Sequence, residues 1–313
     1  MTRLFARLGL SLCLALSSTA FAEPALKVLT SFSILKDFTE QIGGERVAVT
    51  ALVGPDQDAH AFDPRASDIR RLRDADLVVS NGLGFDPWIE RMVASARYTG
   101  PQVVAAAGIT PLDATDGDGH DEHADHDEHA DHGDHHHHGQ TDPHAWLDVR
   151  NAMAYVRTIA AALVAADPDG ADLYRRNESA YLARLQRLDE ALRERLGALP
   201  KARRTVVTPH DAFGYFAHAY GLHFLAPAGI SNESAPSAAA VAALIRQLRD
   251  VGVDRVYIET LTDDRLIERI GAETGARVGG TLYADALSPS HGIDSYLALM
   301  NHNLDVLTSA SER

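Results

Sequence analysis

Histidine is the most abundant side chain in this sequence that could do chemistry. The chain has 16 histidines among 313 residues, and its single cysteine, Cys13, lies close to the N-terminus. Without thiolates elsewhere, any metal ion would have to be held by His, Asp or Glu. Nine histidines fall in the acidic run of residues 116–138, and seven lie elsewhere, namely His60, His144, His210, His218, His223, His291 and His302.

Some of these side chains occupy positions where ligands usually bind. In open α/β sheets, ligands lie beyond the carboxyl ends of the strands. His60, His210 and Asp285 each follow a strand-like run, and His144 follows Pro143, which favours an extended approach. Such residues converge only in three dimensions, so their spacing alone does not define a site. We expect His218, His223, His291 and His302 to be surface or packing residues.

The acidic run carries nine acids and neither Lys nor Arg, and its largest apolar side chain is alanine. Such a segment cannot bury a core, so it is expected to be mobile. A charged, solvated linker is the alternative interpretation. Histidine at every third position among acids favours weak binding of metal ions instead, by His120, His123, His126, His129, His132, His135, His136, His137 and His138.

Short strand-like runs alternate with helical segments on both sides of this run. Strands are predicted at residues 26–30, 46–53, 77–80, 102–106, 205–208, 223–226, 256–259 and 278–282. This rhythm indicates an α/β protein, with two lobes that each contain a parallel sheet flanked by helices. A helix is predicted over residues 149–166, and a longer one over 170–199 joins the two lobes.

The longer helix has one apolar face, formed by Tyr174, Tyr181, Leu185, Leu188, Leu192, Leu196 and Leu199. At 1.5 Å per residue it would be roughly 45 Å long, enough to run along both lobes as a rigid connection. The domains predicted after the N-terminal segment are an N-terminal lobe at 23–165, a linking helix at 166–200 and a C-terminal lobe at 201–313.

Residues 1–22 have the features of a secretory signal peptide. Arg3 and Arg7 precede an apolar run, and Ala20-Phe21-Ala22 fits a cleavage site. Lipid attachment at Cys13 is disfavoured because the bulky Leu12 precedes it. We therefore expect a periplasmic protein that begins at Glu23.

The net charge is strongly negative. It is −15 for the whole chain, and −17 without the signal segment, which carries two arginines and no acid. A charge of this sign repels nucleic acid and suits a cationic ligand.

Two segments resemble the signature motifs of the metal-specific solute-binding proteins of ABC transporters. They are Pro143-His144-Ala145-Trp146-Leu147-Asp148 and His210-Asp211-Ala212-Phe213-Gly214-Tyr215-Phe216. The acidic, His-rich insert before the first motif is similar to that of the zinc-importing branch, the ZnuA and AztC type. The order of motifs, insert, signal peptide and long helix extends this resemblance over essentially the whole mature chain.

The resemblance implies one tight Zn²⁺ site formed by His60, His144, His210 and Asp285. Some zinc-binding members have Glu before the first histidine, whereas this chain has Ala59. Because alanine cannot supply a carboxylate, Asp285 is the expected fourth ligand. Three neutral imidazoles and one carboxylate would give zinc a tetrahedral shell at about 2.0–2.2 Å. Asp148, Asp211 and Glu259 are candidates to orient the imidazoles.

The resemblance also implies partners. These are an inner-membrane permease with its ATPase and a periplasmic protein that donates zinc, with the chain itself acting as a monomer.

Three other functions are compatible with some of these features. A Mn²⁺- or Fe²⁺-binding protein of the same family is disfavoured by His210, because the resemblance implies a carboxylate there in manganese importers and imidazole suits zinc better. A zinc hydrolase is disfavoured because the sequence has neither an HExxH motif nor a nucleophile elbow, so we expect no enzyme. A zinc buffer without a transporter remains open.

Overall fold

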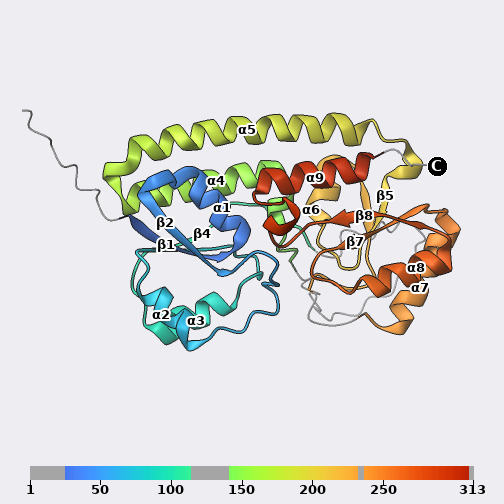
Figure 1. The fold of residues 1–313 in the computed structure, drawn as a ribbon, viewed down its shortest axis with the longest axis horizontal. Coiled ribbons are helices and arrows are strands. Elements are labelled where there is room, and N and C mark those ends of the chain that lie inside the picture. Colours follow the sequence, from blue (N-terminus) through green and yellow to red (C-terminus); the bar gives the residue numbers. More distant parts are fainter. Residues whose placement is uncertain (1–24, 114–140, 232–235, 310–313) are drawn as a thin grey trace, which may run out of the picture.

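The computed structural model describes residues 25–113, 141–231 and 236–309. The predicted signal peptide and the acidic run with its nine histidines lie outside these residues. Within the described ranges the chain forms two α/β lobes beside a long helix (Figure 1).

The N-terminal lobe contains a four-stranded parallel sheet in the order β2-β1-β3-β4. Its strands are β1 (Leu26–Phe32), β2 (Val47–Val53), β3 (Leu77–Ser80) and β4 (Gln102–Val104). Its helices are α1 (Ser33–Gly43), α2 (Ala66–Arg73) and α3 (Trp88–Ala96). The two central strands, β1 and β3, are mostly buried and apolar, as expected for parallel strands covered on both faces.

The C-terminal lobe contains two parallel strand pairs. The first joins β5 (Thr205–Val207) to β6 (His223–Leu225), and the second joins β7 (Arg255–Glu259) to β8 (Arg277–Leu282). The helices are α6 (Gly214–Tyr220), α7 (Ala238–Val251), α8 (Asp264–Thr274) and α9 (Tyr296–Thr308). The expected single sheet of this lobe is therefore divided into two pairs, although β5 and β7 remain in contact.

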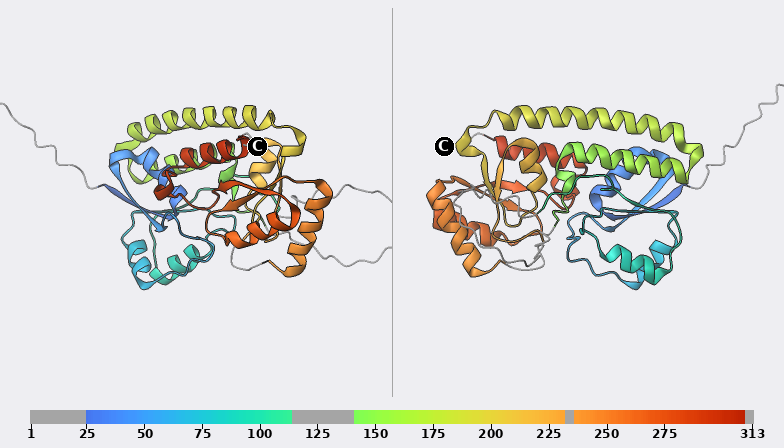
Figure 2. Two further views of the ribbon diagram at one scale, coloured as in Figure 1. Left: turned by 45° about the vertical axis from the view of Figure 1, so that its right-hand side comes forward. Right: turned by 180° about the vertical axis from the view of Figure 1, so that it is seen from behind.

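The long helix is α5 (Ala171–Gly197), and it runs alongside α4 (Val149–Ala166). Both views of Figure 2 show the two lobes on the same side of α5. Six of the seven predicted apolar-face residues are buried within α5, and the seventh, Leu199, is buried just beyond its end. The fold class predicted from the sequence is thus confirmed. In the described ranges, no helix combines the length and apolar character needed to cross a membrane.

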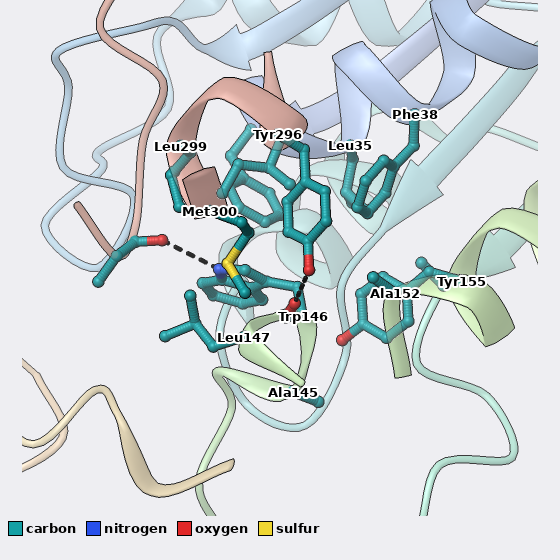
Figure 3. Close-up of a cluster of buried hydrophobic side chains, with 14 of the residues drawn as sticks. Leu35, Phe38, Ala145, Trp146, Leu147, Ala152, Tyr155, Tyr296, Leu299 and Met300 are labelled. Carbon is teal, nitrogen blue, oxygen red and sulfur yellow. Dashed lines mark hydrogen bonds between the residues drawn. The ribbon is translucent and has the colours of Figure 1, made fainter. Parts of the chain in front are cut away.

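A continuous hydrophobic core joins the lobes. Figure 3 shows Trp146 packed among aromatic and aliphatic side chains from α1, α4 and α9. The Tyr296 hydroxyl donates a hydrogen bond to the backbone oxygen of Trp146, and the Trp146 indole N–H donates to the backbone oxygen of Ala284. These two bonds fix the segment around residue 146 against the chain that leads to residue 285.

Candidate metal centre

Four side chains from distant parts of the sequence meet between the lobes. They are His60, in the loop after β2, His144, at the start of the turn before α4, His210, after β5, and Asp285, after β8. One ligand atom of each lies within 4.8 Å of the corresponding atoms of the other three. The structure therefore brings together all four residues that the sequence predicts for the tight site.

The spacing of these atoms suits a small, four-coordinate cation. The His60 Nε2 atom lies 3.2 Å from His144 Nε2, and the His144 Nε2 atom lies 3.4 Å from Asp285 Oδ1. The other carboxylate oxygen, Oδ2, is 3.4 Å from His210 Nε2 and 3.7 Å from His60 Nε2. Ligands about 2.0–2.2 Å from a tetrahedral centre would be about 3.3–3.6 Å apart, so these four distances are compatible with a small four-coordinate metal ion.

The donor atoms are buried. His144 and His210 are fully buried and Asp285 is 4% exposed. Among the described residues, His210 Nε2 and Asp285 Oδ1 are buried without a hydrogen-bond partner. A buried polar atom without a partner is destabilising, so its presence requires an explanation. Coordination of a cation would satisfy both atoms, and the donor set fits such a group.

Two imidazoles are oriented by carboxylates on their far side. The His144 Nδ1 atom lies 2.8 Å from Asp142 Oδ1, which also accepts a hydrogen bond from the His144 backbone N–H. The His210 Nδ1 atom lies 2.8 Å from Glu259 Oε2. A carboxylate at Nδ1 fixes the tautomer that leaves Nε2 free to bind a metal.

The structure changes the list of orienting residues. Glu259 lies at the Nδ1 atom of His210, where an orienting carboxylate was expected. The Asp148 carboxylate instead caps α4, accepts the Arg150 backbone N–H and pairs with the Arg150 guanidinium. Asp142 was not among the candidates, although its position two residues before His144, with Pro143 between them, is a usable signal.

Burial and charge shift the protonation of the site in opposite directions. Burial lowers the pKa of His60 to about 4, although the Asp285 carboxylate acts against this shift. Burial also acts to lower the pKa of His210, but the carboxylates of Glu259 and Asp285 outweigh it and raise that pKa well above its usual value. Burial acts to raise the pKa of Asp285, and the surrounding imidazoles hold it below its usual range.

The four other histidines that the structure describes lie away from this centre. His218, His223 and His291 are exposed, and the half-buried His302 contacts the backbone oxygen of Thr281. The sequence-based expectation of surface or packing roles is consistent with these positions. The nine histidines of the acidic run lie outside the described residues.

The sequence matches a protein family described as ZnuA, zinc-uptake complex component A, periplasmic, over residues 28–310. The chain is 32% identical to the manganese-binding lipoprotein MntA of Halalkalibacterium halodurans over 286 residues, which cover 91% of this chain and 88% of the relative. It is also 32% identical to the iron-binding protein YfeA of Yersinia pestis, covering 90% of this chain and 85% of the relative.

Solved structures are similar over almost their whole length. A Mn-bound periplasmic metal-binding protein from Candidatus Liberibacter asiaticus is 26% identical, with a TM-score of 0.76, and the match covers 90% of this chain and 98% of that one. The periplasmic zinc-binding protein TroA of Treponema pallidum has the same fold, with a TM-score of 0.80 at 24% identity, covering 91% of this chain and 98% of TroA.

Proposed function

We propose that the cargo of this protein is Zn²⁺. The proposal starts from its family: the chain belongs to the family of zinc-uptake complex component A, and it is thus a metal-binding component of an ABC importer. The ion would be held by His60, His144, His210 and Asp285. The observation that carries this proposal is the spacing of three imidazole nitrogens and a carboxylate, which fits tetrahedral zinc.

Each residue of the centre has a role in this proposal. The three imidazoles supply neutral donors, and the Asp285 carboxylate reduces the net charge of the bound ion. Asp142 and Glu259 hold the rings of His144 and His210 in the orientation that binds metal. Because a ligand imidazole must be deprotonated at its donor nitrogen, zinc would displace the proton held near His210 and Asp285.

The zinc-loaded protein would dock on an inner-membrane permease served by a cytoplasmic ATPase. We further propose the domain limits given above, cleavage after Ala22, a monomeric state and a zinc-donating periplasmic partner. The acidic run would collect zinc weakly and pass it to the tight site, as its composition indicates.

Manganese or ferrous iron is the second candidate cargo, and two observations favour it. Relatives at 32% identity are named manganese- and iron-binding proteins. In addition, both oxygens of Asp285 face the imidazoles, so the carboxylate could bind in a bidentate manner and raise the coordination number. Three imidazoles still favour zinc over manganese.

Metal analysis after competition tests this proposal. The protein is stripped with a chelator, dialysed against equal concentrations of Zn²⁺, Mn²⁺ and Fe²⁺ without oxygen, and analysed for bound metal. We expect one tightly held zinc ion per chain, which a His144→Ala/His210→Ala control should lose. Retention of manganese or iron would establish the second candidate, and retention of no metal would contradict both.

A further inference from the structure

His60 differs from the other two histidine ligands in how it is held. His144 and His210 each have a carboxylate 2.8 Å from Nδ1. Within the described residues, no hydrogen bond joins His60 Nδ1 to a carboxylate, although Asp58 Oδ1 accepts the backbone N–H of His60. Its side chain is 7% exposed, whereas those of His144 and His210 are 0% and 1% exposed. His60 is therefore the least constrained and most accessible imidazole of the centre.

A cavity of about 450 Å³ lies next to His60. It is bounded by the N-terminal lobe at Leu83, Phe85 and Pro87, and by the C-terminal lobe at Ile230. Of the four proposed ligands, His60 alone lines it. The cavity thus connects to the centre at one ligand and offers space into which that imidazole could turn.

The ring of Phe85 lies against the imidazole of His60. It stands edge-on to the His60 ring, with 4.7 Å between the ring centroids and 77° between the planes. Phe85 is itself 1% exposed and packs against Phe32 and Trp146, each at a centroid distance of 4.8 Å. Besides its contact with His144 at Nε2, the His60 ring is thus held by an aromatic contact and not by a hydrogen bond to a carboxylate.

The loop that presents Phe85 is firmly fixed. The buried Asp86 carboxylate accepts hydrogen bonds from the backbone N–H groups of Asn81 and Gly82. The Asn81 side chain in turn donates to the backbone oxygen of Pro143, next to His144. Phe85 is therefore a fixed wall against which the His60 ring rests.

We propose that Phe85 is a positioning residue that sets the rate of metal exchange by holding His60 toward the other three ligands. Metal reaches and leaves the centre through the 450 Å³ cavity, and His60 turns into the cavity to exchange it. This inference rests on the proposed function. Because Phe85 holds His60 inward both before and after binding, it slows association and dissociation together and changes the equilibrium little.

The rates of zinc binding and release test this proposal. Association is followed by stopped flow with Zn²⁺ alone, dissociation by transfer to excess chelator, and the equilibrium constant by competition titration. Loss of an aromatic contact in Phe85→Ala should raise both rates by roughly fivefold to tenfold and change Kd by less than about threefold. Phe85→Leu, which disturbs the core less, should give a smaller change in the same direction.

Phe38→Ala is the matched control, because Phe38 is a fully buried phenylalanine of the same hydrophobic core. Its described ring contacts are with Tyr155, Tyr181 and Tyr296, and none is with Phe85 or a ligand imidazole. Its exchange rates should therefore stay within about twofold of the parent protein. Thermal melts of the metal-free variants show whether each one folds, and Phe85→Leu carries the test if Phe85→Ala does not.

Three results would overturn the proposal. They are unchanged rates in the Phe85 variants, faster release alone with a matching loss of affinity, and an equal acceleration in Phe38→Ala. If the parent protein binds manganese instead of zinc, the zinc assignment fails, and the same rate measurements with Mn²⁺ still decide the role of Phe85.

Discussion

Two carboxylates, Asp142 and Glu259, act on the metal centre without belonging to the proposed ligand set. Each contacts the Nδ1 atom of a fully buried imidazole, so it fixes both the ring orientation and the proton position. Residues of this kind determine affinity without contributing a ligand atom.

Replacing Asp142 with Asn should weaken zinc binding by about 10- to 100-fold, because the amide keeps the shape but removes the charge that orients His144. Competition titration against a zinc chelator measures this effect. Asp148→Asn serves as the control, since Asp148 caps α4 and does not orient a ligand. Asp148→Asn should reduce the melting temperature and leave the zinc affinity unchanged. A loss of affinity in Asp148→Asn would contradict the different roles given to Asp142 and Asp148.

The position of His210 should determine which metal is preferred. In the double variant His210→Glu/Glu259→Gln a carboxylate replaces an imidazole while the number of acidic side chains stays the same. The preference for zinc over manganese should fall by about tenfold or more, since carboxylates suit manganese. Mixed-metal dialysis measures the ratio, and His218→Glu, at an exposed position, should leave it unchanged. An unaltered ratio in the double variant would exclude His210 as the selective ligand.

The sequence predicted the four converging residues but only part of their surroundings. The ligand set came from the resemblance to a known family, and the places of His60, His210 and Asp285 after predicted strands agreed with it, since strand ends position ligands. The contact between Asp142 and His144 depends on the local backbone path around Pro143. The ring of Phe85 meets His60 only because two loops from different strands pack together. Neither contact leaves a periodic pattern in the sequence.

At the scale of elements, helix α6 begins at Gly214, where the C-terminal lobe meets the segment that carries His144. A Cβ atom on Gly214 would lie 2.5 Å from the Asp142 carboxylate oxygen Oδ2. That distance is shorter than any normal contact, so the absence of a side chain lets Asp142 approach the helix. The second lobe thereby supports the residue that orients His144.

Gly214→Ala should therefore separate folding from binding. Alanine is the better helix former, but its methyl group should displace Asp142 and weaken zinc binding by about tenfold. Affinity and thermal stability are measured together. Gly197→Ala, at the end of α5 with open space around the position, is the control and should not change affinity. Equal affinities in both variants would show that Asp142 tolerates the displacement.

The elements themselves followed from the sequence more reliably than their pairing. Alternating apolar runs and helical periodicity located the strands of both lobes and the buried face of α5. The division of the second sheet into two strand pairs was not predicted. Pairing between distant strands depends on tertiary packing, which a single sequence does not encode in any local pattern.

Considering the whole molecule, Arg46, beside β2, is tied to the turn between the two long helices α4 and α5. The Arg46 guanidinium makes two hydrogen bonds of 2.8 and 2.9 Å to the Asp167 carboxylate, which also accepts from Tyr174. The hydrogen bonds from Arg46 lower the pKa of Asp167 to about 2. This pair secures the N-terminal sheet to the helices that join the lobes.

Because the pKa of Asp167 is depressed in the folded state, its stabilising contribution is full above about pH 4 and is lost as the pH falls toward about 2. Arg46→Met should lower the free energy of unfolding by about 1–3 kcal/mol at pH 6. The difference in the free energy of unfolding between the parent protein and the variant should shrink below pH 4. Urea titrations over this range measure it, and Arg175→Met, at an exposed pair, should show no gap. A gap that does not vary with pH would contradict the assignment to Asp167.

The acidic run can be tested separately from the tight site. Deletion of residues 116–138 should leave one tightly bound zinc ion, because the four proposed ligands lie elsewhere. The additional weak binding should disappear, and zinc capture should slow in a salt-dependent way as nine acids are lost. Calorimetry and stopped flow measure stoichiometry and rate. Loss of the tight site on deletion would mean that the run supplies one of the principal ligands.

The intrinsic fluorescence of the two tryptophans should report whether the metal centre is occupied. The Trp88 indole N–H donates to the backbone oxygen of Ala59, the residue before His60, and Trp146 donates in the same way to Ala284, the residue before Asp285. Each fluorophore is thus bonded to the peptide group that precedes one ligand. Two single-tryptophan variants would separate these signals. Trp88 would report on His60, the accessible ligand at the cavity, and Trp146 would report on the buried carboxylate of Asp285. If the metal ion enters by way of His60, the fluorescence of Trp88 should change before that of Trp146 after metal is added.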